Sequence, residues 1–298
     1  MPIRIIPASA PMTIDQVVLG IYSLPGIGKT TLGFTAEAPL LLDFDKGAHR
    51  ARNRKDTVSI TNWDEIASLT EDDLKPYKTI IVDTVGRALD VLSADIIKNN
   101  PKHGNGGALS LQGFGVLKSR FSSWLKTMRT YRKDVILLAH MDEKTEGEIT
   151  KERLDVQGGS KAEIYKSVDA MGKIFIEGKT RRLDFSPREG SLGKNPAQFE
   201  VLDVPDCAQG PLFLAEIIRS IKQSINQLSA EQLAQQKAAE EWADRIEKLP
   251  NLDAFNETMV VMKNEPKGIK KLLMDAATNR GLAFNTKTKK FEEGSVAA

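Results

Sequence analysis

The chain has 298 residues, which suggests one large domain or a domain with an appendage, and its net charge is only +2. With 41% hydrophobic and 28% charged residues, the composition is that of a soluble globular protein and does not by itself indicate a nucleic-acid partner. The single cysteine, Cys207, excludes an internal disulfide and fits a reducing compartment. Neither a signal peptide nor an apolar run long enough to span a bilayer is present, so we expect a cytoplasmic protein with no membrane partner.

Apolar runs that alternate with helical patterns predict an α/β fold with a mostly parallel sheet covered by helices on both faces. The expected strands are 17–22, 39–43, 57–61, 78–83 and 134–140, followed by paired strands at 172–177 and 181–185. The expected helices are 29–36, 64–74, 85–98 and 114–131, whereas 99–107 and 141–160 have no clear period. Ligands of such sheets bind at the carboxyl ends of the strands, where polar residues gather in this sequence.

The pattern of predicted strands and helices divides the chain into four parts. We expect an N-terminal arm at 1–14, the α/β core at 15–210, a connecting helix at 211–228 and a small all-helical C-terminal module at 229–298. Ser229-Ala230-Glu231-Gln232 matches a capping box and predicts the start of the module's first helix. Gly281 is expected to end its last helix, and the module is expected to serve docking or assembly.

Residues 23–30, Ser-Leu-Pro-Gly-Ile-Gly-Lys-Thr, follow the first strand and match a P-loop, except that Ser23 replaces its first glycine. In this motif backbone N–H groups cradle phosphates, Lys29 reaches the β- and γ-phosphates, and the Thr30 hydroxyl binds Mg²⁺. The sequence therefore predicts a nucleotide site with ATP and Mg²⁺ as cofactors. The expected nucleotide-binding residues are Ser23, Pro25, Gly26, Ile27, Gly28, Lys29, Thr30 and Thr31.

Acidic residues end the two strands that accompany the P-loop. Asp83 ends a short apolar strand, as does the Walker B acid that holds Mg²⁺ through its water shell. Asp43 and Asp45 end the strand after the P-loop helix, and one of them can deprotonate the attacking water. Both point to the same side of an extended chain, so spacing alone does not choose between them, and the other is expected to cap a turn.

His140 ends the strand that follows the long helix. At that position a histidine can contact the γ-phosphate and report hydrolysis to the next loop. It can equally be a buried, hydrogen-bonded histidine, and the sequence favours neither role.

In this order, these residues resemble the RecA-type ATPase core. More closely, the chain resembles phage-encoded RecA-core ATPases grouped with single-strand annealing recombinases. The resemblance covers about residues 15–205. It rests on the P-loop at 23–30, the segments 41–45 and 80–84, and the strand that ends in His140.

The resemblance implies further roles. Asp45 matches the position of the family's catalytic glutamate, and His140 matches its phosphate-sensing residue. The family completes each ATP site with basic residues of a neighbouring subunit, and here Lys179, Arg181 and Arg182 are the candidates. The implied catalytic residues are therefore Lys29, Asp45, His140, Arg181 and Arg182.

Two DNA-binding loops are also implied by the resemblance. The first is expected at about 99–113, with Lys102 and His103, and the second at about 141–162, with Lys144 and Lys161. We therefore expect a DNA-stimulated ATPase that binds single-stranded DNA during phage homologous recombination, in the cytoplasm of the bacterial host. It would anneal or exchange strands and assemble with itself into rings or filaments with ATP between subunits. A single-strand-binding protein is a further candidate partner.

Three other functions compete with this expectation. The first is an AAA-type loader or remodeller with the C-terminal helices as its lid, although neither Arg245 nor Arg280 lies in a convincing sensor motif. The second is a small-molecule kinase, which would need an arginine-rich lid that the sequence lacks. The third is a nucleotide-switched scaffold with little turnover, because Asp45 stands where the family has glutamate.

Overall fold

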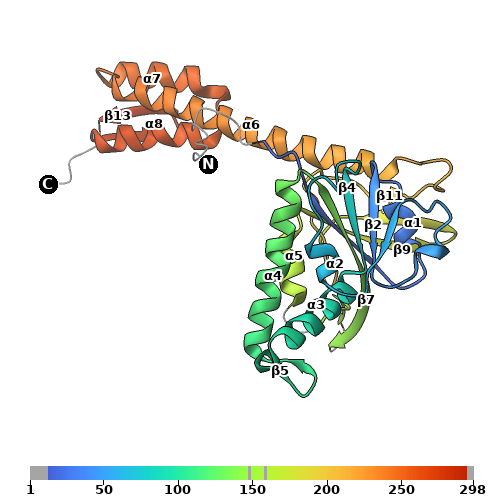
Figure 1. Cartoon of the computed structure of the whole chain (residues 1–298). Coiled ribbons are helices and arrows are strands. Elements are labelled where there is room, and N and C mark those ends of the chain that lie inside the picture. Colours follow the sequence, from blue (N-terminus) through green and yellow to red (C-terminus); the bar gives the residue numbers. More distant parts are fainter. Residues whose placement is uncertain (1–12, 147–148, 158–159, 294–298) are drawn as a thin grey trace. The chain divides into compact units, whose positions relative to one another are not determined.

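The computed structural model describes residues 13–146, 149–157 and 160–293, which belong to two compact units (Figure 1). The larger unit comprises residues 13–225, and residues 226–293 belong to the smaller one. The predicted N-terminal arm lies outside the described residues except for its last two positions. Within the described segments, no helix combines the length and the apolar character that crossing a membrane requires.

A mostly parallel sheet forms the centre of the larger unit, with the strand order β11-β10-β9-β1-β7-β4-β2-β3 (Figure 1). Its strands are β1 (Val18–Ser23), β2 (Pro39–Asp43), β3 (Thr57–Ser59), β4 (Thr79–Asp83), β7 (Asp134–Glu146), β8 (Ile149–Leu154), β9 (Ala170–Glu177), β10 (Thr180–Asp184) and β11 (Leu202–Asp203). Strands β10 and β11 extend one edge antiparallel, and β8 pairs antiparallel with the end of β7. The order places β7 between the P-loop strand β1 and the acidic strand β4.

Helices cover both faces of this sheet, as the sequence predicts (Figure 1). They are α1 (Lys29–Gly33), α2 (Asp64–Ala67), α3 (Val85–Asn99), α4 (Leu111–Thr130), α5 (Ser160–Ser167) and the first part of α6 (Phe213–Glu247), with 3-10 turns η1 (Ala48–Arg50) and η2 (Pro101–His103). Helices α2 to α5 share one apolar core with the sheet, and α1 and α6 share the other.

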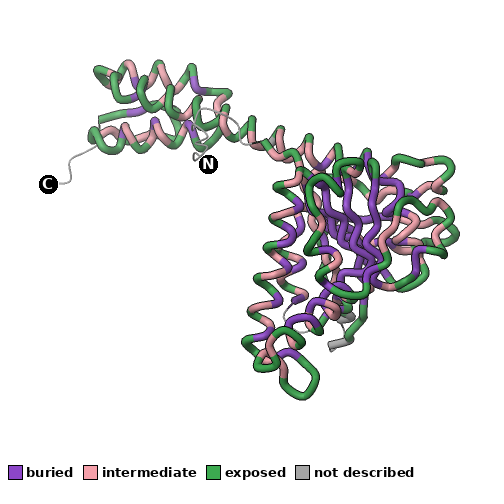
Figure 2. Tube along the Cα trace, viewed as in Figure 1, coloured by how far each residue is buried: buried purple, intermediate pink, exposed green. Residues whose placement is uncertain are grey.

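The central strands are buried on both faces, which explains why they are continuous apolar runs rather than alternating ones (Figure 2). On β7, Val135 and Leu137 belong to the core beneath α3 and α4, whereas Ile136 and Leu138 belong to the core beneath α1 and α6. Successive side chains of a strand point to opposite faces, so one apolar run supplies both cores.

The polar segment after His140 has no clear period in the sequence, but the structure shows that it forms a β-hairpin. Strand β7 continues to Glu146 and pairs with β8 from Met141↔Leu154 onward. A second, smaller hairpin of β5 (Gly104–Asn105) and β6 (Ala108–Leu109) lies within the predicted loop before α4. Charged residues such as Asp142, Glu143 and Lys144 are exposed, so the first hairpin shows no apolar period.

Two predicted helices are shorter than expected. Helix α1 ends at Gly33 rather than near residue 36, because the chain turns at Thr35, whose hydroxyl donates to the Leu32 carbonyl and accepts from the Leu214 N–H. Helix α2 ends at Ala67 rather than at 74. Beyond it, the Thr70 N–H and hydroxyl both donate to Asp73, and such local bonds compete with helical ones.

The predicted helix start at 229–232 is wrong. Helix α6 runs unbroken from Phe213 to Glu247, so the expected connecting helix and the first helix of the module are one element. A capping box requires a non-helical residue at its first position. Here neither Gly nor Pro interrupts the helical pattern on either side, so the helix continues through Ser229.

The smaller unit has an apolar core of its own. It consists of the last part of α6, α7 (Leu252–Val261), the turn η3 (Met262–Asn264), α8 (Lys267–Asn279) and a hairpin of β12 (Leu282–Asn285) and β13 (Lys290–Glu293). Gly281, with φ of 77°, follows the end of α8 as predicted. The hairpin was not expected, and it contributes Phe291 to a core that includes Phe255 and Leu273.

Candidate nucleotide site

The P-loop connects the end of β1 to the start of α1, as the sequence predicts. Gly26 and Gly28 have φ of 80° and 95°, conformations that residues with side chains rarely adopt. At Gly28 a Cβ atom would also lie 2.7 Å from Nη1 of Arg181. Glycine at this position therefore allows both the turn of the loop and the approach of an arginine.

Lys29 lies beneath the loop with a relative exposure of 5%. Its Nζ donates to the Ser23 carbonyl (3.2 Å), the Ser23 hydroxyl (3.1 Å) and the Leu24 carbonyl (3.1 Å), and it lies 3.1 Å from Nδ1 of His140. Burial lowers the pKa of Lys29 to about 8. A buried ammonium group among neutral acceptors fits a site for an anion, as a triphosphate site requires.

Thr30, at the start of α1, contacts Asp83 at the end of β4. The Thr30 hydroxyl donates to Oδ2 of Asp83 at 2.6 Å, and burial raises the pKa of Asp83 although this hydrogen bond opposes the change. These two side chains fit Mg²⁺ that keeps several waters and binds substrate phosphates. No cluster of three or more His, Cys, Asp or Glu residues suited to a metal occurs in the described segments.

Asp43, the last residue of β2, and Asp45, two residues later, have different surroundings. The carboxylate of Asp43 is buried and accepts hydrogen bonds from the N–H groups of Gly47 (3.1 Å) and Ala48 (3.0 Å), so it caps the turn η1. Asp45 faces the cavity above the P-loop instead, and its side chain is 18% exposed. The geometry therefore favours Asp45 over Asp43 as the candidate base, which the sequence alone could not decide.

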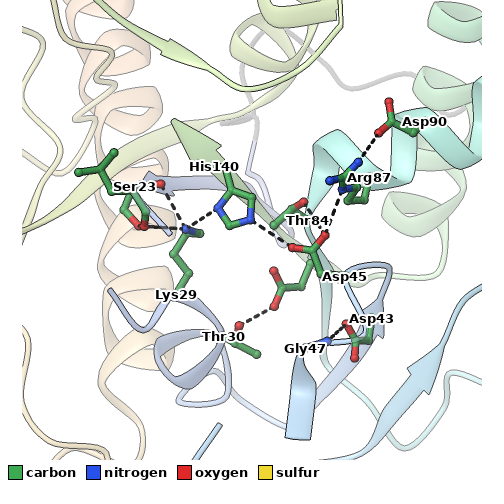
Figure 3. A network of polar contacts seen from close by, with 12 residues as sticks. Ser23, Lys29, Thr30, Asp43, Asp45, Gly47, Thr84, Arg87, Asp90 and His140 are labelled. Atoms are coloured by element: carbon green, nitrogen blue, oxygen red, sulfur yellow. Dashed lines mark hydrogen bonds and ion pairs between the residues drawn. The ribbon is translucent and has the colours of Figure 1, made fainter. Parts of the chain in front are cut away.

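His140 lies between Lys29 and Asp45 (Figure 3). Its Nε2 is 3.2 Å from Oδ2 of Asp45, and this contact lowers the pKa of Asp45. The order of the sheet explains the placement, because β7 lies beside β1 and its residue His140 is in register with Ser23. Lys29, His140 and Asp45 thus form one network of polar contacts across the ends of the strands.

Arg87 also belongs to this network of polar contacts, and its place there was not expected from the sequence. Its Nε lies 3.7 Å from Oδ1 of Asp45, and its Nη1 lies 3.3 Å from Oδ2 of Asp90 (Figure 3). Arg87 is in the first turn of α3, four residues after Asp83. A basic residue one turn into the helix that follows an acidic strand is the only sequence signal that marks this position.

A cavity of about 690 Å³ lies above the P-loop. Its walls come from the P-loop, the loop after β2, the hairpin of β9 and β10, and the loop after β11. The lining includes Pro25 to Thr31, Asp45, Gly47, Arg50, Ala51, Arg52, Asp83, His140, Ile176, Arg181, Asp206 and Cys207. All of the expected nucleotide-binding residues except Ser23 line the cavity, and the Ser23 carbonyl and hydroxyl accept hydrogen bonds from Lys29.

The model of the AAA domain family matches residues 15–197, which is more than half of the chain. The chain belongs to the AAA domain family. Its P-loop, acidic strand end and mostly parallel sheet are those of a P-loop ATPase with the predicted RecA-like fold. A solved structure of a KaiC-like protein from the hyperthermophilic archaeon Pyrococcus horikoshii matches 68% of this chain and 100% of its own, at 10% identity and a TM-score of 0.37. The comparison with curated proteins finds no match.

In this AAA domain, Arg181 and Arg182 do not face the same surroundings. Arg181 lines the P-loop cavity of its own chain, near Gly28, and its expected role at the site of a neighbouring subunit stays a prediction. Arg182 points to the other face of β10 and forms ion pairs with Glu177 (2.6 Å) and Asp203 (3.1 Å). The alternation of side chains along a strand separates the two arginines.

The four expected DNA-binding residues of the AAA domain lie on three separate elements. Lys102 and His103 are in η2, where the His103 carbonyl accepts a hydrogen bond from Ser110 N–H at 2.8 Å and closes the small β5–β6 hairpin. Lys144 lies on β7 beyond His140, and Lys161 lies in the first turn of α5. Their binding of DNA remains a prediction.

Proposed function

We propose that this chain is an ATPase that uses ATP binding and hydrolysis to act on single-stranded DNA in phage homologous recombination. The observation that carries the ATPase part is the chain of contacts from Lys29 through His140 to Asp45 at the P-loop cavity. It combines a buried cation for phosphate, a histidine in contact with that cation, and a carboxylate that faces the cavity.

The residues have distinct tasks in hydrolysis. Lys29 and the P-loop backbone bind the phosphates, and Thr30 and Asp83 would hold Mg²⁺, which would supply positive charge opposite the charge that develops on the departing ADP. Asp45 accepts the proton of the water that attacks the γ-phosphorus as the bond to the β-phosphate oxygen breaks. The contact with His140 lowers the pKa of Asp45 and so keeps this base ionised.

The site is also connected to the hairpin of β7 and β8. His140 and the hairpin belong to the same strand, and the Asp155 N–H returns to the His140 carbonyl at 2.9 Å. On β8, Glu152 accepts a hydrogen bond from the buried Tyr22 hydroxyl at 3.0 Å, and Tyr22 directly precedes Ser23 of the P-loop. A change in phosphate occupancy could therefore affect the hairpin through His140 or through the contact between Tyr22 and Glu152.

Single-stranded DNA is proposed as the partner because the resemblance assigns the segment after His140 to a DNA-binding loop. We propose that nucleotide orders this hairpin and that hydrolysis relaxes it. Lys102, His103, Lys144 and Lys161 would contact mainly phosphates, since aromatic side chains are scarce near them. Assembly into rings or filaments would align such contacts along one strand.

The test is ATP hydrolysis by the full chain with and without single-stranded DNA, at low and moderate salt. Stimulation that fades as salt rises is expected, because phosphate contacts release counterions. Robust hydrolysis that is indifferent to DNA would contradict the DNA part and favour a loader or remodeller. Tight ATP binding without hydrolysis would contradict the ATPase part and favour a nucleotide-switched scaffold.

A further inference from the structure

We propose that Arg181 binds the phosphates of the nucleotide held by the P-loop of the same subunit. The inference rests on the proposed function, because it requires that the P-loop cavity binds a nucleotide. It differs from the expectation drawn from the resemblance, in which this arginine serves the site of a neighbouring subunit.

The position of the guanidinium group is the first support. Nη1 of Arg181 lies 2.7 Å from the point where a Cβ of residue 28 would be, so the guanidinium sits directly against the P-loop backbone. The backbone N–H groups of a P-loop cradle the α- and β-phosphates. A nucleotide bound there therefore meets Arg181 at its inner phosphates, which ADP and ATP share.

The second support is the way in which the side chain is held. Nη2 of Arg181 donates to the Pro205 carbonyl at 3.2 Å, and Pro205 immediately precedes the cavity residues Asp206 and Cys207. A guanidinium has five N–H donors in a rigid fork, so this bond uses one donor and directs the fork. Arg181 is thereby oriented before any phosphate arrives, which suits bidentate binding of phosphate oxygens.

The third support is the contrast with the next residue. Arg181 is in register with Ile176 of β9, and both side chains line the cavity. Arg182 is in register with Phe175 and is occupied by Glu177 and Asp203 on the opposite face. Two adjacent arginines thus differ in their access to the cavity, and Arg182 provides a matched control.

Binding of Mg²⁺–ADP, measured by isothermal titration calorimetry on the full-length protein, tests the proposal, since ADP is not consumed. Arg181→Ala is expected to weaken binding about 10-fold or more, because a charge-assisted hydrogen bond is lost. The affinity of Arg182→Ala is expected to stay within about twofold of wild type, because the substitution removes only the surface ion pairs with Glu177 and Asp203. Addition of excess Lys29→Ala subunits, which retain Arg181, is expected to leave the weak binding of Arg181→Ala unchanged.

Wild-type affinity in Arg181→Ala, or recovery of that affinity on mixing with Lys29→Ala, would overturn the proposal. If Arg181→Ala does not fold by circular dichroism, Arg181→Gln replaces it, since an amide can still donate to Pro205 but carries no charge. Wild-type affinity in that variant would overturn the proposal equally. Wild-type affinity in Lys29→Ala would instead contradict the P-loop site and the proposed function itself.

Discussion

Nε2 of His140 lies 3.2 Å from Oδ2 of Asp45, and the other ring nitrogen of His140 lies 3.1 Å from the ammonium group of Lys29. One imidazole thus contacts both the residue that would bind the γ-phosphate and the residue that would activate water. Loss or gain of a phosphate at Lys29 changes the partner available to the imidazole. We therefore expect the occupancy of the phosphate site to affect the proposed base, Asp45, through the side chain of His140.

Substitution of Asp43, the last residue of β2, and of Asp45 should have different effects. Asp45→Asn is expected to bind ATP but to hydrolyse it about 100-fold or more slowly, because the general base is lost. Asp43→Asn should retain turnover within a few-fold and lose about 1 kcal/mol of stability, because it weakens the cap of η1. Steady-state ATPase assays and thermal denaturation measure the two effects. Normal hydrolysis by Asp45→Asn and slow hydrolysis by Asp43→Asn would show that the assignment is reversed.

The acid side of the pH–rate profile should depend on His140. The hydrogen bond from His140 lowers the pKa of Asp45, so the carboxylate stays ionised until the pH falls through that lowered value. In His140→Ala the pKa of Asp45 rises, and activity should disappear at a higher pH on the acid side. The profile of kcat against pH measures this shift separately from the loss of absolute rate.

Arg87→Ala is the comparison for that experiment. Arg87 also lowers the pKa of Asp45, but it makes a smaller contribution, and its side chain is 66% exposed. The acid limb should therefore move in the same direction by less, and the difference from wild type should shrink at high salt. A shift in Arg87→Ala larger than that in His140→Ala would contradict the order of these two effects.

Lys29 is expected to destabilise the protein in the absence of nucleotide. Its pKa falls from 10.5 to about 8, so the unfolded chain holds a proton more tightly than the folded one, at a cost on the order of 3 kcal/mol at neutral pH. This cost is fully present below pH 8 and disappears as pH rises toward 10.5. Lys29→Met should raise the melting temperature at pH 7, with a smaller gain at pH 10, and should abolish stabilisation by Mg²⁺–ADP. A lower melting temperature in the variant would contradict this account.

The contact between Tyr22 and Glu152 should couple the hairpin to the P-loop strand. The Tyr22 hydroxyl donates to the Leu192 carbonyl (2.8 Å) or to Glu152 (3.0 Å), and the Leu192 N–H donates back to it at 3.0 Å. Tyr22→Phe should lose about 1–3 kcal/mol of stability and reduce any stimulation of ATPase activity by single-stranded DNA. Basal ATPase activity of Tyr22→Phe should persist. Stimulation by single-stranded DNA equal to that of wild type would show that the contact between Tyr22 and Glu152 does not couple the hairpin to the P-loop strand.

Local sequence patterns predict the strands and the P-loop because their apolar runs and glycines act over a few residues. Asp83 could be placed in the same way, as an acid at the end of a buried strand. Spacing along the strand could not choose between Asp43 and Asp45, since their difference depends on N–H groups of Gly47 and Ala48 that only the folded turn presents.

Other features depend on which distant segments meet. The separation of Arg181 from Arg182 requires knowledge of which face of β10 adjoins the P-loop, and the role of Arg87 requires the approach of α3 to Asp45. The continuation of α6 through Ser229 shows the opposite error, in which a local capping pattern is overridden by the helical sequence around it.

The register of β7 against β1 determines which side chain of β7 lies beside the P-loop. His140 is the only polar residue between Val135 and Met141, and its neighbours are Ala139 and Met141. A slip of β7 by one residue relative to β1 would put an apolar side chain opposite Ser23 and would also exchange the two cores. Packing residues deep in the sheet therefore set the alignment of His140 with Ser23, and we expect conservative substitutions there to alter turnover without contacting the nucleotide.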